Sequence, residues 1–300
     1  DEQGAECQDA VDMVVLAVGI GLSAANRAML DASGVERGRG GFVATDPYAP
    51  VATSRPGVFV AGTLGGPGEA SLASVQGSAA ALEALAAVRV SPPPREPLPV
   101  LVLGGGAAGL ACSLGLAGCG QRVTLVEASA RLGGHPRKHP TVWKGRETKE
   151  AVAQMAEAVL NHPGITVLAA LRLLAAAPTA QAWTGSLTTP QGTQEIAFGA
   201  AVLALGSGEA RPDEYLLGRD PRVMTQLEFE NWRRTHPEPD DTPQTVVFIQ
   251  CVGSRQRHGF TACARVCCAQ ALCAAVELKK SRPGAQVAVF YRDITTPGES

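Results

Sequence analysis

A glycine-rich turn between two apolar segments is the feature that most constrains how this chain can fold. Gly104-Gly105-Gly106-Ala107-Ala108-Gly109 follows an apolar run at 100–103 and opens a second one over 107–118. In a strand-turn-helix of this kind, the three motif glycines permit a tight turn, close approach to a pyrophosphate, and close helix–strand packing. The helix start also presents free N–H groups to phosphates. The sequence therefore predicts a dinucleotide site in a parallel α/β domain, and the alternative is a glycine-rich turn without a ligand.

An acidic residue and a glycine pair extend this motif. Glu127 ends the next expected strand, 122–126, where it is placed to accept hydrogen bonds from ribose hydroxyls. NAD and FAD share the fingerprint, but Gly133-Gly134 resembles the glycine pair that abuts the FAD pyrophosphate in two-dinucleotide-binding flavoproteins. We therefore favour FAD. Arg131 is expected either to contact phosphate or adenine, or to be an exposed surface residue.

Two further segments are expected at the same site. Residues 57–62 read Gly-Val-Phe-Val-Ala-Gly and match a later strand of that superfamily, but Thr63 stands where those proteins carry an Asp that reaches the flavin. Gly206 ends the apolar run 200–205, whose pattern repeats the run 14–19. The stretch between the strands at 11–19 and 56–62 is expected to be a polar loop. Helices are expected over 71–88 and 148–161, and a hairpin around Trp183 and Glu195.

Four cysteines close together form the second informative motif. Cys251, Cys263, Cys267 and Cys268 follow the pattern C-x11-C-x3-C-C. Cys251 stands at the end of an expected strand, and a helix is expected over 264–280. On a helix, Cys263 and Cys267 share one face and Cys268 is turned about 100° away. Four thiolates can ligate an iron–sulfur cluster. Zinc ranks second because its structural sites more often use C-x2-C pairs. A redox disulfide between adjacent cysteines is strained, and inert packing of four cysteines is improbable. Cys273 is expected to pack on the same helix.

Around the cysteines the chain resembles the A subunit of heterodisulfide reductase and its bacterial relatives, which include the quinone-interacting oxidoreductase complex of sulfate reducers. The resemblance lies in segments 248–255, 263–268 and 290–294, and extends to 213–231, 53–63 and 74–79. It implies a two-dinucleotide-binding, Rossmann-like flavoprotein fold with parallel sheets flanked by helices, a [4Fe–4S] cluster on the four cysteines, and FAD. It also implies an oxidoreductase that passes electrons among flavin, cluster and partner subunits in anaerobic metabolism, some members bifurcating electrons at the flavin.

The order of motifs departs from the family. The ferredoxin-like insert that the family often carries is missing, and what looks like a module's end precedes the next module's beginning. We therefore expect a piece of a tandem protein, with the end of one FAD/NAD(P)-binding module at 1–90, a Pro-rich linker at 91–97, and the beginning of a second module at 98–300 that contains the iron–sulfur segment 245–280. Folding of 1–90 against 98–210, as if permuted, is a further expectation.

Composition excludes some classes of function. The net charge is −2 and no long basic run is present, which argues against nucleic acid as a partner. No apolar stretch suggests a membrane-spanning segment and no signal peptide is recognised, so a cytoplasmic location is expected. We find no nucleophile–base constellation and expect no catalytic side chain, because the chemistry belongs to the cofactors. The remaining alternatives are an NAD(P)-linked disulfide-type reductase with structural zinc and a non-catalytic scaffold that docks partner subunits.

Overall fold

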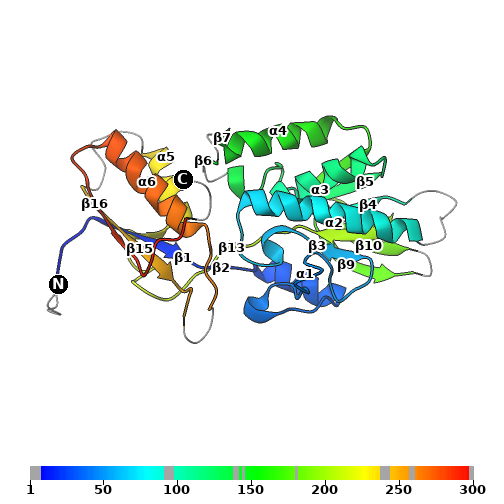
Figure 1. Cartoon of the computed structure of the whole chain (residues 1–300), viewed down its shortest axis with the longest axis horizontal. Helices are drawn as coiled ribbons and strands as arrows, with labels where there is room; N and C mark the ends of the chain where they lie inside the picture. Colours follow the sequence, from blue (N-terminus) through cyan, green and yellow to red (C-terminus); the bar gives the residue numbers. More distant parts are fainter. Residues whose placement is uncertain are drawn as a thin grey trace. The chain divides into compact units, whose positions relative to one another are not determined.

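The computed structural model describes residues 8–90, 98–137, 142–143, 146–179, 182–236, 244–256 and 261–296. It divides into two compact units, each treated separately below (Figure 1). The larger unit contains 20–208, and the smaller unit contains 8–19 and 209–296. This division differs from the expected boundary at 91–97, a segment outside the described residues. Whether 1–90 and 98–300 descend from two modules stays a prediction.

The larger unit is built on a five-stranded, all-parallel sheet in the order β3-β12-β4-β5-β8. Its strands are β3 (Val58–Val60), β4 (Val100–Leu103), β5 (Val123–Glu127), β8 (Ile165–Ala169) and β12 (Ala200–Leu203). Every residue of β3, β4 and β12 is buried, as expected for parallel strands covered on both faces. Because β3 precedes the expected linker and β12 follows it, segments far apart in sequence form one sheet.

Three helices pack against successive strands of this sheet. Helix α2 (Ala70–Val90) contacts β3 and β12, α3 (Ala107–Gly118) contacts β4 and β5, and α4 (Thr148–Asn161) contacts β8. The three helices are labelled in Figure 1. Contrary to the expectation from sequence, α2 is long and apolar enough, over Ala70–Val88, to cross a membrane by length and composition. Within the unit it contributes buried alanines to the core shared with α3.

The rest of the larger unit includes an antiparallel sheet and a helix that was not expected from the sequence. The sheet has the order β11-β10-β9, and its hairpin lies where it was expected. Helix α1 (Ala24–Ser33) replaces part of the expected polar loop. Its signals are local: Ser23 accepts a hydrogen bond from the Asn26 N–H at 3.1 Å, and Gly34 ends the helix with φ of 66°. The strands of the antiparallel sheet are β9 (Leu173–Pro178), β10 (Trp183–Thr189) and β11 (Gly192–Phe198).

Short elements complete the larger unit and its connections. Two two-stranded sheets pair β2 with β13 and β6 with β7. The strands and single helical turns are β2 (Ile20–Gly21), β6 (Val142–Trp143), β7 (Arg146–Glu147), β13 (Gly208–Glu209), η1 (Arg39–Gly41), η2 (Gly62–Leu64) and η3 (His135–Arg137).

The smaller unit repeats the parallel α/β plan with four strands in the order β14-β1-β15-β16. One face of the sheet is covered by two helices. Their buried residues, among them Phe229, form a core with Val15 and Phe248 of the strands. The opposite face carries a second apolar cluster around Leu16 and Val252. The elements are β1 (Met13–Val18), β14 (Val223–Thr225), β15 (Thr245–Val252), β16 (Gln286–Phe290), α5 (Gln226–Thr235) and α6 (Cys267–Ser281).

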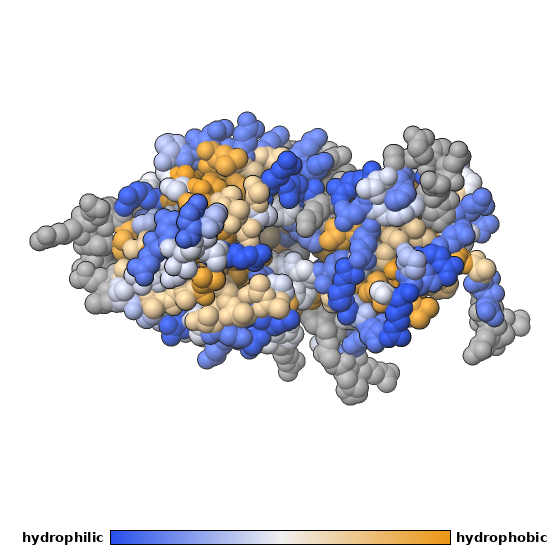
Figure 2. All heavy atoms as spheres, turned by 180° about the vertical axis from the view of Figure 1, so that it is seen from behind, coloured by the Kyte–Doolittle hydropathy of each residue, from blue (hydrophilic) through white to orange (hydrophobic). Residues whose placement is uncertain are grey.

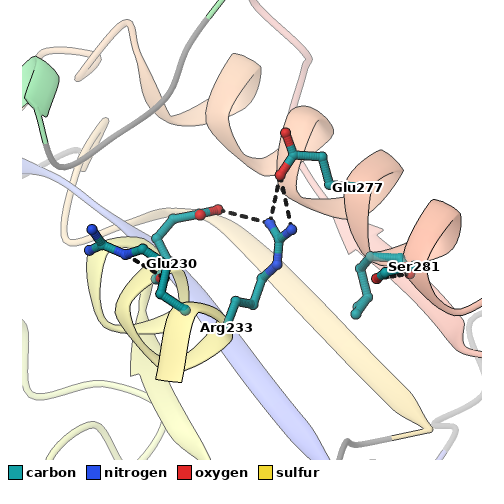
Figure 3. Close-up of polar contacts among 6 residues, drawn as sticks. Glu230, Arg233, Glu277 and Ser281 are labelled. Carbon is teal, nitrogen blue, oxygen red and sulfur yellow. Dashed lines mark hydrogen bonds and ion pairs between the residues drawn. The ribbon is translucent and has the colours of Figure 1, made fainter. Parts of the chain in front are cut away.

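An ion pair joins the two helices of the smaller unit (Figure 3). Both Nη atoms of Arg233 on α5 lie 2.9 Å from one Glu277 carboxylate oxygen on α6, and Nη1 also lies 3.4 Å from Glu230. Burial raises the pKa of Glu230, and the Arg233 charge offsets part of that rise. At its start, α5 has a capping box in which Thr225 and Glu228 satisfy each other's backbone N–H groups.

The expected helix over 264–280 begins later than predicted, at Cys267. Cys263 therefore does not share a helical face with Cys267, because Arg265 between them has φ of 66° and interrupts the helical path.

On the surface seen from behind, hydrophobic and hydrophilic residues are interspersed (Figure 2).

The contact between α2 and α3 gives a test of the larger unit's packing. A Cβ atom on Gly77 of α2 would lie 2.1 Å from the Ala108 carbonyl oxygen at the start of α3. We expect Gly77→Ala to destabilise the protein by about 1–3 kcal/mol, the cost of overpacking a core contact. Gly118→Ala is the control, since no atom lies within 4 Å of its added Cβ. Urea unfolding measures both, and equal stability of the two variants would contradict the packing.

Candidate functional site

The glycine-rich turn brings the end of β4 and the start of α3 into backbone contact. A Cβ atom on Gly104 would lie 2.3 Å from the Ala204 carbonyl oxygen, and one on Gly109 would lie 1.8 Å from the Gly104 carbonyl oxygen. The Gly104 N–H donates to the Val126 carbonyl at 2.8 Å. A larger residue at position 109 would force α3 away from the end of β4, and one at position 104 would collide with the chain after β12. Gly109 therefore lies in the close helix–strand contact that its place in the motif predicts.

The start of α3 has no side-chain cap. Gly106 is its N-cap, in extended conformation, and makes no side-chain capping bond. The first N–H groups of a helix, here those of Ala107, Ala108 and Gly109, have no acceptor within the helix. Together with the helix dipole they favour an anion at this end.

The glycine pair lies directly on this turn. The Gly133 N–H donates to the Gly105 carbonyl at 2.8 Å, and a Cβ atom on Gly134 would lie 2.9 Å from the Gly106 Cα. Residues separated by helix α3 and strand β5 are thus held against each other by backbone contact.

Glu127 is tied to the same turn. One of its carboxylate oxygens accepts from the Gly105 N–H at 2.7 Å, and the other accepts from the Ser129 N–H and hydroxyl, both at 2.7 Å. The predicted acid therefore lies beside the glycine-rich turn. Arg131 is exposed.

The remaining predicted cofactor residues lie at the neighbouring strand ends. The position of a Cβ on Gly206, just after β12, is 3.7 Å from the Thr63 hydroxyl oxygen. The corresponding position on Gly62, just after β3, is 3.0 Å from the Ala108 Cβ. Because β3, β12, β4 and β5 are adjacent and parallel, the structure gathers these residues at one edge of the sheet, where open α/β sheets bind ligands.

Two polar side chains at this edge were missed. Gln76 on α2 accepts from the Gly62 N–H at 3.0 Å, and Asn26 on α1 donates to the Gly206 carbonyl at 3.1 Å. The position of Gln76 in an otherwise Ala-rich helix could have indicated that its side chain has a polar partner. For Asn26 there was none, because its partner is remote in sequence.

In the smaller unit, a β-bulge places the first cysteine of the motif. Leu16 of β1 pairs with Ile249 of β15, whereas Val18 pairs with Val252, so β15 has one extra residue over this stretch. Cys251 lies within it, with φ of 61°, and is buried. Bulges redirect side chains at strand ends, and this one interrupts the alternation of β15 at the cysteine.

The other three cysteines lie where the chain enters α6. Cys267 and Cys268 are the first two residues of the helix and are buried, and the Cys263 sulfur accepts from the Arg265 N–H at 3.3 Å. A helix N-terminus stabilises thiolates by its dipole. The Gln226 side chain at the start of α5 donates to the Cys267 carbonyl at 3.0 Å.

The four thiols influence one another electrostatically. The pKa of Cys267 is raised to about 12. Burial is the largest cause, and the neighbouring Cys268, Cys263 and Cys251 add to the rise. Burial also raises the pKa of Cys251, and a hydrogen bond from Arg255 opposes this rise.

All described cysteines are free thiols. Within the described ranges, no group of three or more His, Cys, Asp or Glu side chains is arranged to hold a metal ion. The four metal ligands therefore stay predictions.

We call the carboxyl edge of the parallel sheet, with the turn 104–109, Glu127, the pair 133–134, Gly62, Thr63 and Gly206, the nucleotide edge. Glu127 provides a test of it. Glu127→Gln keeps the side chain's size but places an NH2 group where carboxylate oxygens accept from Gly105 or Ser129, so one N–H loses its acceptor. We expect a loss of about 1–3 kcal/mol of stability and roughly tenfold weaker FAD binding, since a disturbed turn presents the start of α3 poorly. Thermal unfolding and calorimetric titration measure these effects. Glu83→Gln, at an exposed position on α2, is the control, and identical behaviour of the two variants would refute the role of Glu127.

Comparison with known proteins agrees with this geometry. Residues 98–235 match the family described as pyridine nucleotide-disulphide oxidoreductase. The A subunit of the ferredoxin:CoB-CoM heterodisulfide reductase from Methanosarcina mazei is 34% identical over 124 residues, covering 36% of this chain and 16% of that protein. The A subunit of the H(2)/formate:CoB-CoM heterodisulfide,ferredoxin reductase from Methanococcus maripaludis is 36% identical over 117 residues, covering 35% and 18%.

A solved structure shows a weaker likeness. L-proline dehydrogenase from P. horikoshii superposes with a TM-score of 0.44 at 16% identity, over 64% of this chain and 35% of that one, too low a score to carry an argument. The chain covers less than a fifth of the curated relatives described above. By its sequence, the chain has a match to the pyridine nucleotide-disulphide oxidoreductase family at 98–235, and over about a third of its length it is similar to A subunits of heterodisulfide reductases.

Proposed function

We propose that this chain is a FAD- and [4Fe–4S]-dependent electron-transfer subunit of an oxidoreductase. The observation that carries the proposal is the presence of two sites with different chemistry in one chain. One is a glycine-rich turn at a helix N-terminus, suited to a pyrophosphate. The other is a set of four cysteines between the bulge of β15 and the start of α6, whose thiols are the usual ligand type of iron–sulfur clusters.

The residues of the larger unit fit a dinucleotide. At Gly104, Gly109 and Gly134 an added Cβ would collide with backbone atoms, so the chain has kept the turn free of side chains. The N–H groups at the start of α3 would bind the pyrophosphate, and Glu127 would face a ribose. The glycine pair at 133–134 favours FAD over NAD. When bound, FAD supplies transfer of one or two electrons, and the protein supplies binding and orientation.

The donor set of the smaller unit fits an iron–sulfur cluster. Four Cys thiolates are the usual ligands of [4Fe–4S] clusters. The bulge turns Cys251 out of the strand pattern, and Cys267 and Cys268 are the first two residues of α6. Free thiols suit a reducing compartment such as the cytoplasm, where we propose the protein acts.

Partner subunits are part of the proposal. The relatives are named as subunits of heterodisulfide reductases that also involve ferredoxin, formate, hydrogen or F(420)H(2). For this chain we propose electron exchange with other subunits of such a complex.

Cofactor analysis of the anaerobically purified protein tests the proposal. We expect one FAD, about four irons and about four acid-labile sulfides per chain, with an EPR signal after dithionite reduction. Cys268→Ser should lose iron and sulfide but keep flavin, because the cysteines are not part of the nucleotide edge. Cys273→Ser, an exposed cysteine of the same helix, is the matched control and should keep both. Zinc without sulfide would contradict the cluster, and protein without flavin would contradict the dinucleotide site.

A further inference from the structure

A buried amide beside the cysteine motif has no partner within the described part of the chain. Gln250, the residue before Cys251, is 6% exposed. Both its Nε2 and its Oε1 are buried, and neither has a hydrogen-bond partner among the residues that the structure describes. Burying an amide without a partner is unfavourable, so native proteins rarely do so without a reason.

The strand pattern places Gln250 on the face covered by α5 and α6. Val246 and Phe248 belong to the core on that face, and Ile249 packs with the cluster on the opposite face. Side chains alternate along a strand, so Gln250 is the next member of the Val246–Phe248 row. The bulge at Cys251 follows directly.

The two helices over this face both begin at the same edge of the sheet. Helix α5 follows β14 without a break, and α6 lies between the parallel strands β15 and β16, so both run back from the strands' carboxyl ends. At this edge, Gln226 at the start of α5 bonds the Cys267 carbonyl at the start of α6. Gln250 is therefore at the end of the sheet where the four cysteines lie.

A neighbouring glutamine shows how this edge treats a structural amide. Gln226 is 5% exposed, about as buried as Gln250, and its Nε2 is satisfied by the Cys267 carbonyl. The two amides thus differ in pairing and not in burial. Among the described residues, the Gln250 Nε2 is a buried donor without an acceptor.

We propose that Gln250 is a positioning residue for the group that the four cysteines hold, donating an amide N–H to one of its sulfurs. The inference rests on the proposed [4Fe–4S] cluster. Sulfurs of an anionic cluster accept hydrogen bonds, and such bonds stabilise the more negative, reduced state and raise the reduction potential. The unpaired Gln250 amide then lowers the stability of the metal-free protein, whereas in the protein that holds the cluster it makes a stabilising hydrogen bond.

Substitution by methionine separates these two effects. Gln250→Met removes the unpaired amide, so we expect a metal-free protein that melts a few degrees higher than the metal-free wild type. In the loaded protein we expect a lower midpoint potential, with the equilibrium constant for cluster reduction reduced by about tenfold, as for the loss of one hydrogen bond to a charged group. Gln226→Met is the control and should melt lower in both states.

Glutamate distinguishes the amide nitrogen from the amide oxygen. Gln250→Glu keeps an acceptor but loses the donor and brings a carboxylate toward an anionic group. If the N–H donates to sulfur, this variant should lose iron to a chelator faster than Gln250→Met. If only the oxygen matters, Gln250→Glu should match the wild type, which would overturn the proposal.

Other results also overturn the inference, and they identify which proposal failed. A metal-free Gln250→Met that melts lower than the wild type would show that the amide is paired without the cluster. A loaded Gln250→Met with wild-type potential and EPR spectrum would refute the hydrogen bond while leaving the cluster in place. Absence of iron from the wild type would refute the proposed cluster itself, and with it the role of Gln250.

Discussion

Backbone contact at the turn between β4 and α3 is the constraint on which the larger unit depends. Gly109 lies against the Gly104 carbonyl, and Gly104 lies against Ala204 at the end of β12. The contact sets the position of α3, and α3 in turn sets the position of α2 through Gly77. The glycine pair 133–134 then closes on the turn from the far end of β5. Close packing here leaves helix N–H groups as the chemistry available to a ligand.

The smaller unit uses the same parallel plan for a different purpose. Two helices again start at the carboxyl edge of a parallel sheet, and an ion pair from Arg233 to Glu277 links them. At this edge the chain carries thiols instead of bare backbone. A bulge, a left-handed Cys251 and a Gln250 amide unpaired among the described residues are all local departures from good strand structure. Such departures concentrate at functional sites, where a bound group offsets their cost.

Much of the secondary structure could be predicted, for reasons that are local. Helices α3 and α4 have the predicted bounds because a glycine turn opens one and an amphipathic pattern with a clear stop defines the other. The hairpin of β10 and β11 was marked by Gln191-Gly192 at its turn. Helix α1 was missed although Ser23 and Gly34 marked its ends, because its sequence is short and Leu30 is its one buried residue among those described. The start of α6 was misplaced because no residue type announced the left-handed Arg265.

The sequence by itself determined the two motifs, their residue types and the chemistry those types can do, because a glycine's missing side chain and a cysteine's thiol are properties of single residues. Tertiary structure alone decided which residues meet. It joined β3 to β12 across the expected linker, brought Gln76 and Asn26 to the nucleotide edge, and kept Cys263 off the helix. It also left Gln250 buried beside Cys251 without a partner in the described part of the chain. These outcomes depend on burial and on contacts between segments far apart in the chain, which residue patterns do not encode locally.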